Sequence, residues 1–177
     1  MRKLLTVALT TGLLALAPAA HAVRVMPGSF TGYAFDQCLT PSQEEMDVWL
    51  EHSPYWGVGV YLAGVNRQCD VQPNLTSDWV AEQSRKGWRI LPLTVGRQAA
   101  CTAYPALIDD SQANSYAAAK AQGRAEAVTT VAASEAVGLP KKTTHWLDIE
   151  DFDVLDTHCR RSVLAFISGW TSKLHKL

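Results

Sequence analysis

The residues best suited to chemistry lie in one short stretch, 144–153, which reads THWLDIEDFD. It carries four acidic side chains directly after a tryptophan and a leucine: Asp148, Glu150, Asp151 and Asp153. Alternate side chains of a strand share a face, so Asp148 and Glu150 should lie about 7 Å apart on the face that also carries Trp146. Crowded carboxylates raise one another's pKa, so one can keep a proton while the other is ionised. Such a pair can supply a general acid and can stabilise a developing positive charge.

Four strand and helix pairs must position these side chains. The β-rich runs that we predict as strands cover 28–36, 57–64, 88–96 and 144–153. The predicted helices lie within 38–53, 76–86, 111–138 and 157–177. This alternation predicts an α/β fold with a parallel sheet and crossover helices. Ligands bind at the carboxyl ends of parallel strands, so Asp36, which ends the first strand, should reach the same rim as Asp148 and Glu150.

Local signals give the expected ends of several elements. Thr40 is the predicted N-cap of the first helix, with Gln43 completing a capping box. Thr76 is the predicted N-cap of the second helix, in preference to an acceptor for glycosylation on the preceding asparagine. Gly87 occupies the position of a glycine that ends this helix. Pro92 has no N–H to donate, which predicts a bulge in the third strand.

The first 22 residues have the order of a secretory signal peptide. Arg2 and Lys3 precede a mostly apolar run, and the small-residue motif Ala-His-Ala ends at Ala22. The apolar run is too short for a good membrane span. We therefore expect a mature chain, 23–177, that forms one domain and is secreted, either extracellular or associated with the cell wall. The formal net charge is −1 and the basic residues are not clustered, so we expect no nucleic-acid partner and, after signal cleavage, no membrane partner.

All four cysteines follow the predicted cleavage site. An even number of cysteines in an exported chain predicts two disulfides. Their spacing lacks the paired ligands of a zinc site, and we predict neither a metal nor another cofactor. The first three cysteines each follow a strand, and the second and third strands should be neighbours. We therefore predict that Cys69 pairs with Cys101 and that Cys38 pairs with Cys159.

With these elements in place, four segments together resemble a known family: GYAFDQCLTPS, GVGVYLAGVNRQCDVQPNLTSDWV, GWRILPLTVGRQAAC and HWLDIEDF. The chain is similar to the glycoside-hydrolase-like TIM-barrel domain of unknown function found in secreted actinobacterial proteins. That domain is distantly similar to lysozymes that carry an Asp-x-Glu pair on their fourth strand. The resemblance spans about 32–174 and implies a β/α barrel with an acidic pocket that acts on or binds cell-wall polysaccharide, peptidoglycan being one such polymer.

The resemblance also assigns roles to individual residues. Asp36, Asp148 and Glu150 match the family's acidic positions, and we expect Glu150 to be the general acid because Asp148 and Asp151 crowd it. Asp148 and Asp36 would orient the substrate or stabilise positive charge. Trp146 and Asp151 are the expected substrate-binding residues, since a sugar ring can stack on the indole of Trp146.

Related domains continue into further strands, whereas a full eight-unit barrel needs about 250 residues. The resemblance therefore implies that 23–177 forms the N-terminal half of a barrel, about four β/α units, with the C-terminal part truncated. Four strands alone leave an inner face and two sheet edges open, with the aliphatic side chains of 57–64 among those expected to point inward. We expect the chain to associate, as two copies closing one barrel, or to aggregate.

Other interpretations of the acidic run remain open. A lysozyme-like hydrolase, a non-catalytic glycan-binding module and an inactive truncated remnant all fit the residues, and Glu150→Gln separates the first two. A solvated acidic loop is the plainest alternative. A calcium site is a further one, but the run has no glycine at the turn position of an EF-type loop and lacks its spacing.

Overall fold

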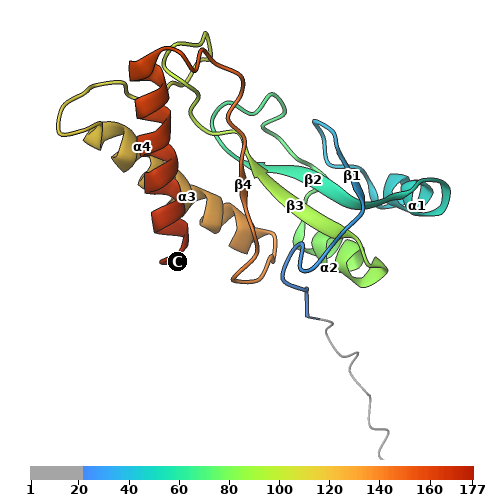
Figure 1. The fold of residues 1–177 in the computed structure, drawn as a ribbon. Coiled ribbons are helices and arrows are strands. Elements are labelled where there is room, and N and C mark those ends of the chain that lie inside the picture. The colour runs from blue at the N-terminus through green and yellow to red at the C-terminus, as the bar shows by residue number, and fades with distance from the viewer. Residues whose placement is uncertain (1–21) are drawn as a thin grey trace, which may run out of the picture.

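The computed structural model of the chain describes residues 22–177, so the predicted signal peptide lies outside the described part except for Ala22. The elements alternate strictly along the chain, as Figure 1 shows. The strands are β1 (Tyr33–Asp36), β2 (Tyr55–Ala63), β3 (Arg89–Thr94) and β4 (Trp146–Leu147). The helices are α1 (Gln43–His52), α2 (Ser77–Lys86), α3 (Ala117–Ala136) and α4 (Thr157–Leu174).

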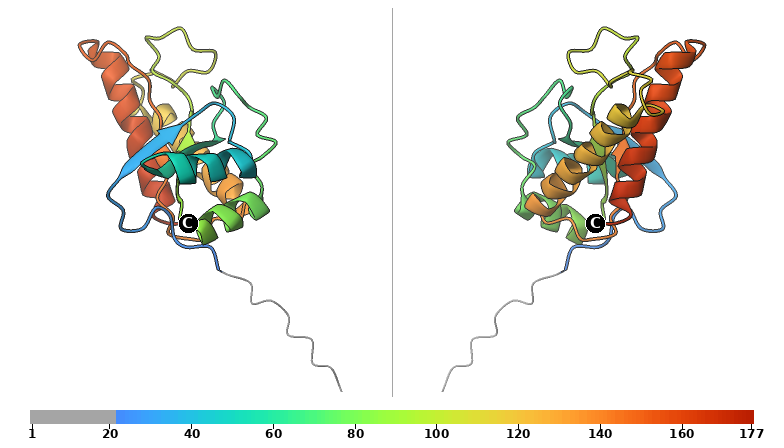
Figure 2. Two further views of the ribbon diagram at one scale, coloured as in Figure 1. Left: turned by 90° about the vertical axis from the view of Figure 1, so that its right-hand side faces the viewer. Right: turned by 90° about the vertical axis from the view of Figure 1, so that its left-hand side faces the viewer.

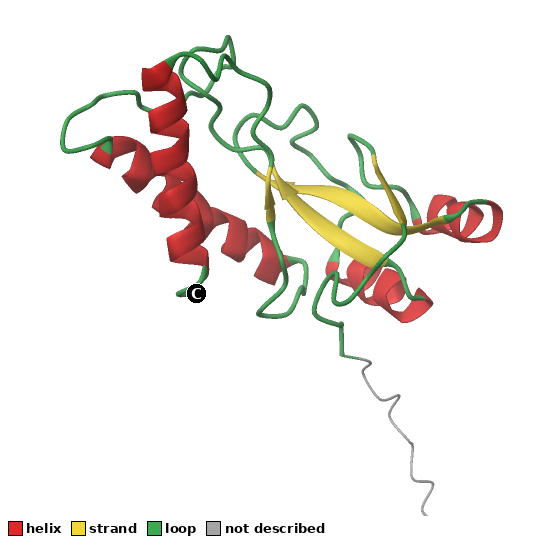
Figure 3. Ribbon diagram, in the orientation of Figure 1, coloured by secondary structure: helices red, strands yellow, loops and turns green. Residues whose placement is uncertain are grey.

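The four strands form one parallel sheet in the order β1-β2-β3-β4. The sheet curls into a half-barrel, which confirms the predicted partial β/α barrel with about four units. Figure 3 shows that the loops following the strands gather at one end of the sheet, where the carboxyl ends of the strands lie. Within residues 22–177, β1 pairs only with β2 and β4 pairs only with β3, so both outer strands keep an open edge.

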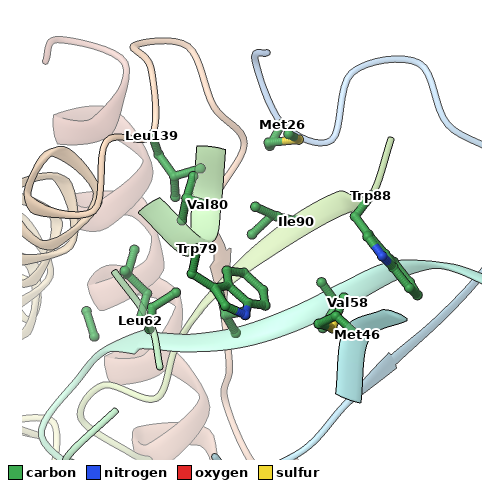
Figure 4. Close-up of a cluster of buried hydrophobic side chains, with 12 residues drawn as sticks. Met26, Met46, Val58, Leu62, Trp79, Val80, Trp88, Ile90 and Leu139 are labelled. Carbon is green, nitrogen blue, oxygen red and sulfur yellow. The ribbon is translucent and has the colours of Figure 1, made fainter. Parts of the chain in front are cut away.

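The larger hydrophobic core lies between the sheet and helices α1 and α2. Val58, Val60 and Leu62 of β2 are buried in it. They pack in one cluster with side chains from both helices, including Trp79 of α2 and Met46 of α1, which Figure 4 shows. The expectation that the aliphatic side chains of 57–64 point into the barrel is therefore wrong for these three residues. The strand alternates, and its other face carries Gly57, Gly59 and Tyr61.

Gly59 marks the opposite, inner face of the sheet. A Cβ atom at Gly59 would lie 2.7 Å from the Cβ of Asp36 and 3.1 Å from the Cδ1 of Leu93. The side chains of the neighbouring strands β1 and β3 therefore lean over β2 at this point. Because glycine has no side chain, the two flanking strands can turn their inner side chains toward each other.

Helices α3 and α4 pack against each other in close contact (Figure 2). A Cβ at Gly123 of α3 would lie 2.0 Å from the carbonyl oxygen of Phe166, and one at Gly169 of α4 would lie 2.1 Å from that of Lys120. Only glycine permits this approach of the two backbones. A second core cluster lies here and includes Phe166 and Val163, with Leu147 and Ile149 packed against it.

Two of the expected helix boundaries are confirmed and one is wrong. The side chain of Thr76 accepts a hydrogen bond from the Trp79 N–H, and Gly87 ends α2 with a φ of 99°. In α1 the N-cap is Ser42, whose side chain forms a capping box with Glu45. Thr40 does not cap this helix, because it is buried and both its N–H and its hydroxyl donate to the side chain of Gln72.

The predicted bulge at Pro92 is also wrong. Pro92 pairs in register with Val60, and the irregularity between β2 and β3 falls between Tyr61 and Ala63. The pairing of β3 with β4 begins only at Leu93. Pro92 precedes this pairing, so β3 can hold a residue without an N–H at that position.

Both disulfides form, but the predicted pairing is wrong. Cys38 bonds to Cys69, and Cys101 bonds to Cys159. The loop after β2 folds back onto the loop after β1, where the side-chain amide of Gln72 donates to the carbonyl oxygens of Cys38 (2.7 Å) and Cys69 (3.0 Å). The long segment after β3 instead reaches the first turn of α4, which carries Cys159. Strand adjacency alone could not decide between these pairings, because neighbouring loops on either side of β2 satisfy it equally.

The Cys101–Cys159 bond closes a segment with a sequence separation of 58. Replacing both cysteines with serine is expected to lower the free energy of unfolding by about 4 kcal/mol, because the denatured chain regains the entropy of that loop. Urea denaturation followed by intrinsic fluorescence measures the change. An unaltered denaturation midpoint would contradict this expectation. The corresponding Cys38 and Cys69 double variant is the matched comparison, with a slightly smaller loss because its separation is 31.

Candidate active site

An acidic pocket lies at the carboxyl ends of the strands. It has a volume of about 250 Å³ and both Asp148 and Glu150 line it. Its remaining lining residues come from the loops after β1, β2 and β3 and from β2 itself: Cys38, Tyr61, Asn66, Gln68, Cys69, Val95 and Tyr104. The two carboxylates that the sequence placed on one face are thus brought together in one concave site.

Asp36 does not line the pocket itself, but a hydrogen bond connects it to Tyr61, which does. The Tyr61 hydroxyl donates to Oδ1 of Asp36 at 2.6 Å. Tyr61 is two positions beyond Gly59 on the inner face of β2, so its ring passes over the strand end that carries Asp36. Sequence reasoning missed Tyr61, although the same period of two that placed Asp148 and Glu150 would have placed it on the inner face.

Charge accumulates around the Tyr61 hydroxyl and the Asp148 carboxyl. The hydrogen bond to Asp36 is the main cause that raises the pKa of Tyr61 to about 12, with burial and the charges of Asp36, Asp148 and Glu150 adding to it. Tyr61 therefore stays protonated and acts as a hydrogen-bond donor at neutral pH. Burial, and then the charge of Asp36, raise the pKa of Asp148 above its ordinary value. These effects show that Asp36, Tyr61, Asp148 and Glu150 share one electrostatic environment.

Asp148 and Glu150 differ in their exposure. Both line the pocket, but Asp148 is half-buried whereas Glu150 is exposed. A half-buried carboxyl and an exposed one in the same pocket have different surroundings, which is the arrangement that lets two carboxyl groups take different roles.

Trp146 and Asp151, like Asp36, lie outside the pocket lining. Trp146 is half-buried on β4, where it pairs with Leu93 of β3. Leu93 faces the inner side with Gly59, so Trp146 also belongs to the inner face, below the pocket. Asp151 is exposed and does not line the pocket.

Part of the acidic run serves the local backbone instead of the pocket. Asp153 accepts a hydrogen bond from the Leu155 N–H at 2.9 Å, which shapes the turn before α4. Asp156 is the N-cap of α4 and accepts from the N–H groups of His158 and Cys159. Within the run 144–153, Asp148 and Glu150 thus line the pocket, whereas Asp153 shapes the turn that leads to the capping residue Asp156.

The strand that carries the pair is shorter than predicted. β4 covers only Trp146 and Leu147, after which the Asp148 N–H still donates to the carbonyl oxygen of Thr94 at 2.9 Å. Beyond that point the backbone of the pair is held by the side chain of Gln98, which sequence reasoning also missed. Gln98 lies in an irregular segment, so no periodicity in the sequence marks it.

A larger cavity of about 860 Å³ lies away from the acids. It is bounded by the ends of α3 and α4 and by the segment before β4, and its polar side chains include Lys141, Lys142 and His175. It contains no pair of carboxylates. The smaller pocket is therefore the better candidate, because it carries the chemistry and lies at the carboxyl ends of the strands.

Two further observations concern the described residues as a whole. None of the helices within 22–177 has both the length and the apolar character needed to cross a bilayer. In the same residues, no three side chains of the metal-ligating types come together as a candidate metal site.

Comparison with known proteins identifies a family for most of the chain. Residues 47–177 match the family model described as Rv2525c-like, glycoside hydrolase-like domain. No curated protein and no solved structure matches the chain.

Proposed function

The chain belongs to the Rv2525c-like family of glycoside hydrolase-like domains, and from this premise we propose that it acts on a cell-wall polysaccharide at the acidic pocket, with Glu150 as general acid. The observation that carries the proposal is the convergence of Asp148, Glu150 and the Asp36–Tyr61 pair at one end of the sheet. The family description by itself supports a role that involves glycans. The substrate, the proton donor and secretion are our inference.

The proposed reaction uses one carboxyl as an acid and the others as anions. Glu150 lines the pocket and is exposed, so its carboxyl can meet a glycosidic oxygen. It donates its proton to that oxygen as the bond to the anomeric carbon breaks. Asp148 and Asp36, when ionised, stabilise the positive charge that develops on the sugar. Water then completes hydrolysis by adding to the anomeric carbon, and its proton passes to a carboxylate of the site.

Trp146 and Asp151 are proposed to contact parts of the glycan beyond the reacting bond. Trp146 lies on the inner face below the pocket, and its indole offers a surface on which a sugar ring can stack. Asp151 is exposed next to Glu150 and can accept hydrogen bonds from sugar hydroxyls. Both residues would therefore affect binding of a long glycan more than turnover of a short one.

We also propose that the protein is secreted and works outside the cell or on the wall. Two observations support this localisation. The first 22 residues have the pattern of a signal peptide. All four cysteines are paired in disulfides, which persist in oxidising compartments.

A second candidate function is glycan binding without cleavage. Asp36 and Glu150 are exposed, and the four described strands form only half of a barrel wall around the pocket. Catalysis by carboxyl groups gains from a site that excludes water, whereas binding does not require one. Glu150→Gln separates the two functions, because it removes the proton donor while leaving a hydrogen-bonding side chain of the same size.

The charge of Asp36 should control the ionisation of Asp148. Asp36→Asn removes a neighbouring negative charge, which favours the ionised form of Asp148, so the pKa of Asp148 is expected to fall. It should stay above the ordinary value, because burial is the larger cause of its rise. The same substitution should lower the pKa of Tyr61 from about 12 toward 10.

Carboxyl-detected NMR titration measures Asp148, and ultraviolet titration of the phenolate measures Tyr61. Asp78→Asn, on the exposed surface of α2, is the matched control and should change neither. A pKa of Asp148 that rises or stays constant in Asp36→Asn would show that the two carboxyls are not coupled.

A further inference from the structure

Gln98 makes an unusual set of contacts with the segment that carries the two carboxylates. Its side chain is fully buried. Its Nε2 donates to the carbonyl oxygen of Asp148 at 2.9 Å, and its Oε1 accepts from the N–H of Glu150 at 2.9 Å. The side-chain amide of Gln98 therefore satisfies both backbone groups that flank Ile149, the carbonyl of Asp148 and the N–H of Glu150.

This pattern is that of a strand residue in a parallel ladder. In such a ladder one residue donates its N–H to the carbonyl before its partner and accepts from the N–H after it. The Gln98 amide does the same around Ile149, at the point where β4 has ended. The side chain thus extends the pairing of β4 by one position without any strand to provide it.

Gln98 is itself held in place from several directions. Its N–H donates to the carbonyl oxygen of Ala106 at 3.1 Å, and its carbonyl oxygen accepts from the Ile108 N–H at 2.8 Å. Its Nε2 also lies 3.2 Å from the carbonyl oxygen of Gly96. A buried amide with its donor and acceptor both engaged has one orientation available, because the reverse orientation would leave a carbonyl facing a carbonyl.

We propose that Gln98 is the positioning residue of the acidic pocket, fixing the backbone of Asp148 and Glu150 so that both carboxyls face the same pocket. The contact itself stands independently of what the protein does. Its consequence for activity rests on the proposed function, since it is the relative placement of these two carboxyls that catalysis would use. A small displacement of a reacting group costs about 100-fold in rate.

The test uses two substitutions of Gln98 and a matched control. Gln98→Leu keeps the approximate volume and removes all three side-chain hydrogen bonds, including the two to the backbone of Asp148 and Glu150. Gln98→Glu keeps the shape and the acceptor, and it regains a donor toward Asp148 only when its new carboxyl is protonated at low pH. Gln122→Leu is the control, because the Gln122 side chain accepts from the Asp109 N–H in a loop away from the acids.

Amide hydrogen exchange of Glu150, measured by NMR on the mature chain, reports the contact directly. Exchange at Glu150 is expected to accelerate at least about tenfold in Gln98→Leu and to stay unchanged in Gln122→Leu. In Gln98→Glu the protection should return as the pH falls. Near-ultraviolet circular dichroism confirms that each variant is folded. Unchanged exchange at Glu150 in folded Gln98→Leu would overturn the inference.

Turnover of peptidoglycan fragments, or their affinity if no turnover occurs, reports the functional consequence. We expect kcat to fall about 100-fold in Gln98→Leu with a much smaller change in KM, and activity of Gln98→Glu to recover toward low pH. Faster exchange at Glu150 with unaltered kcat and affinity would overturn the positioning role. A wild-type protein that neither cleaves nor binds any glycan would instead defeat the proposed function, and the exchange measurement would still decide the contact.

Discussion

Glu150→Gln is expected to lower the rate of glycan hydrolysis by about 10²–10⁴-fold and to leave glycan binding nearly unchanged, because the amide cannot donate the proton that the leaving group needs. Release of soluble fragments from purified cell walls measures the rate, and a pull-down with insoluble peptidoglycan measures binding. Asp148→Asn is expected to cause a loss of similar size, and Asp36→Asn a smaller one. Asp110→Asn, at an exposed position of the segment between β3 and α3, is the matched control.

The roles of Glu150 and Asp148 can be separated by the leaving group. A substrate with an activated aryl leaving group needs little protonation, so it should largely restore the activity of Glu150→Gln. It should not restore Asp148→Asn, whose missing charge acts on the sugar itself. The reverse result would assign proton donation to Asp148, whose pKa is raised by burial and by Asp36. Unchanged rates in all three carboxyl variants would remove the hydrolase proposal.

Self-association is the second large expected effect. The described sheet has two open edges, β1 and β4, and parallel strands with unpaired backbone groups attract further strands. Its inner face carries Leu91, Leu93 and Trp146, all half-buried. Exposure of several hundred Å² of apolar surface costs on the order of 10 kcal/mol, comparable with the stability of a whole domain. The polypeptide 23–177 should therefore form a dimer in which two halves close one barrel, or aggregate.

The apolar inner face is smaller than the sequence suggested, because Val58, Val60 and Leu62 are buried against α1 and α2. The expected dimer consequently depends on β3 and β4. Leu93→Lys should shift the dimer to monomer by placing a charge on the inner face, whereas Leu164→Lys, on the exposed side of α4, should not. Size-exclusion chromatography with light scattering distinguishes the states. A stable, cooperatively unfolding monomer at micromolar concentration would show that the four strands cover their own inner face.

The sequence predicted the order of the elements because each strand and helix repeats its apolar residues with a distinct period. It also predicted that Asp36, Asp148 and Glu150 lie toward the carboxyl ends of the strands, since all three follow or end strands. These predictions depend only on residues close together in the chain. They did not require any information about contacts between loops.

Two of the predictions that failed depended on contacts made by loops. Thr40 carries the residue type of a helix cap, but it donates instead to the side chain of Gln72, 32 residues away in a loop. The disulfide pairing depended on the path of the segment after β3, which periodicity does not describe. The role of Gln98 could not be predicted for the same reason, since it comes from hydrogen bonds to residues 50 and 52 positions away in the chain. Long-range polar contacts of this kind leave no repeat in the sequence.

The absence of a side chain at Gly59 has a consequence for how this protein would respond to mutagenesis. Any larger residue there would meet the Cβ of Asp36 at 2.7 Å and would push that carboxylate away from Tyr61. A saturation library selected for glycan binding should therefore deplete every substitution at position 59 as strongly as it depletes changes to the carboxylates. Gly59 would appear in such a scan as a functional position although it has no functional group. The pocket should consequently tolerate changes in the loops that border it better than any change at position 59 of the strand beneath it.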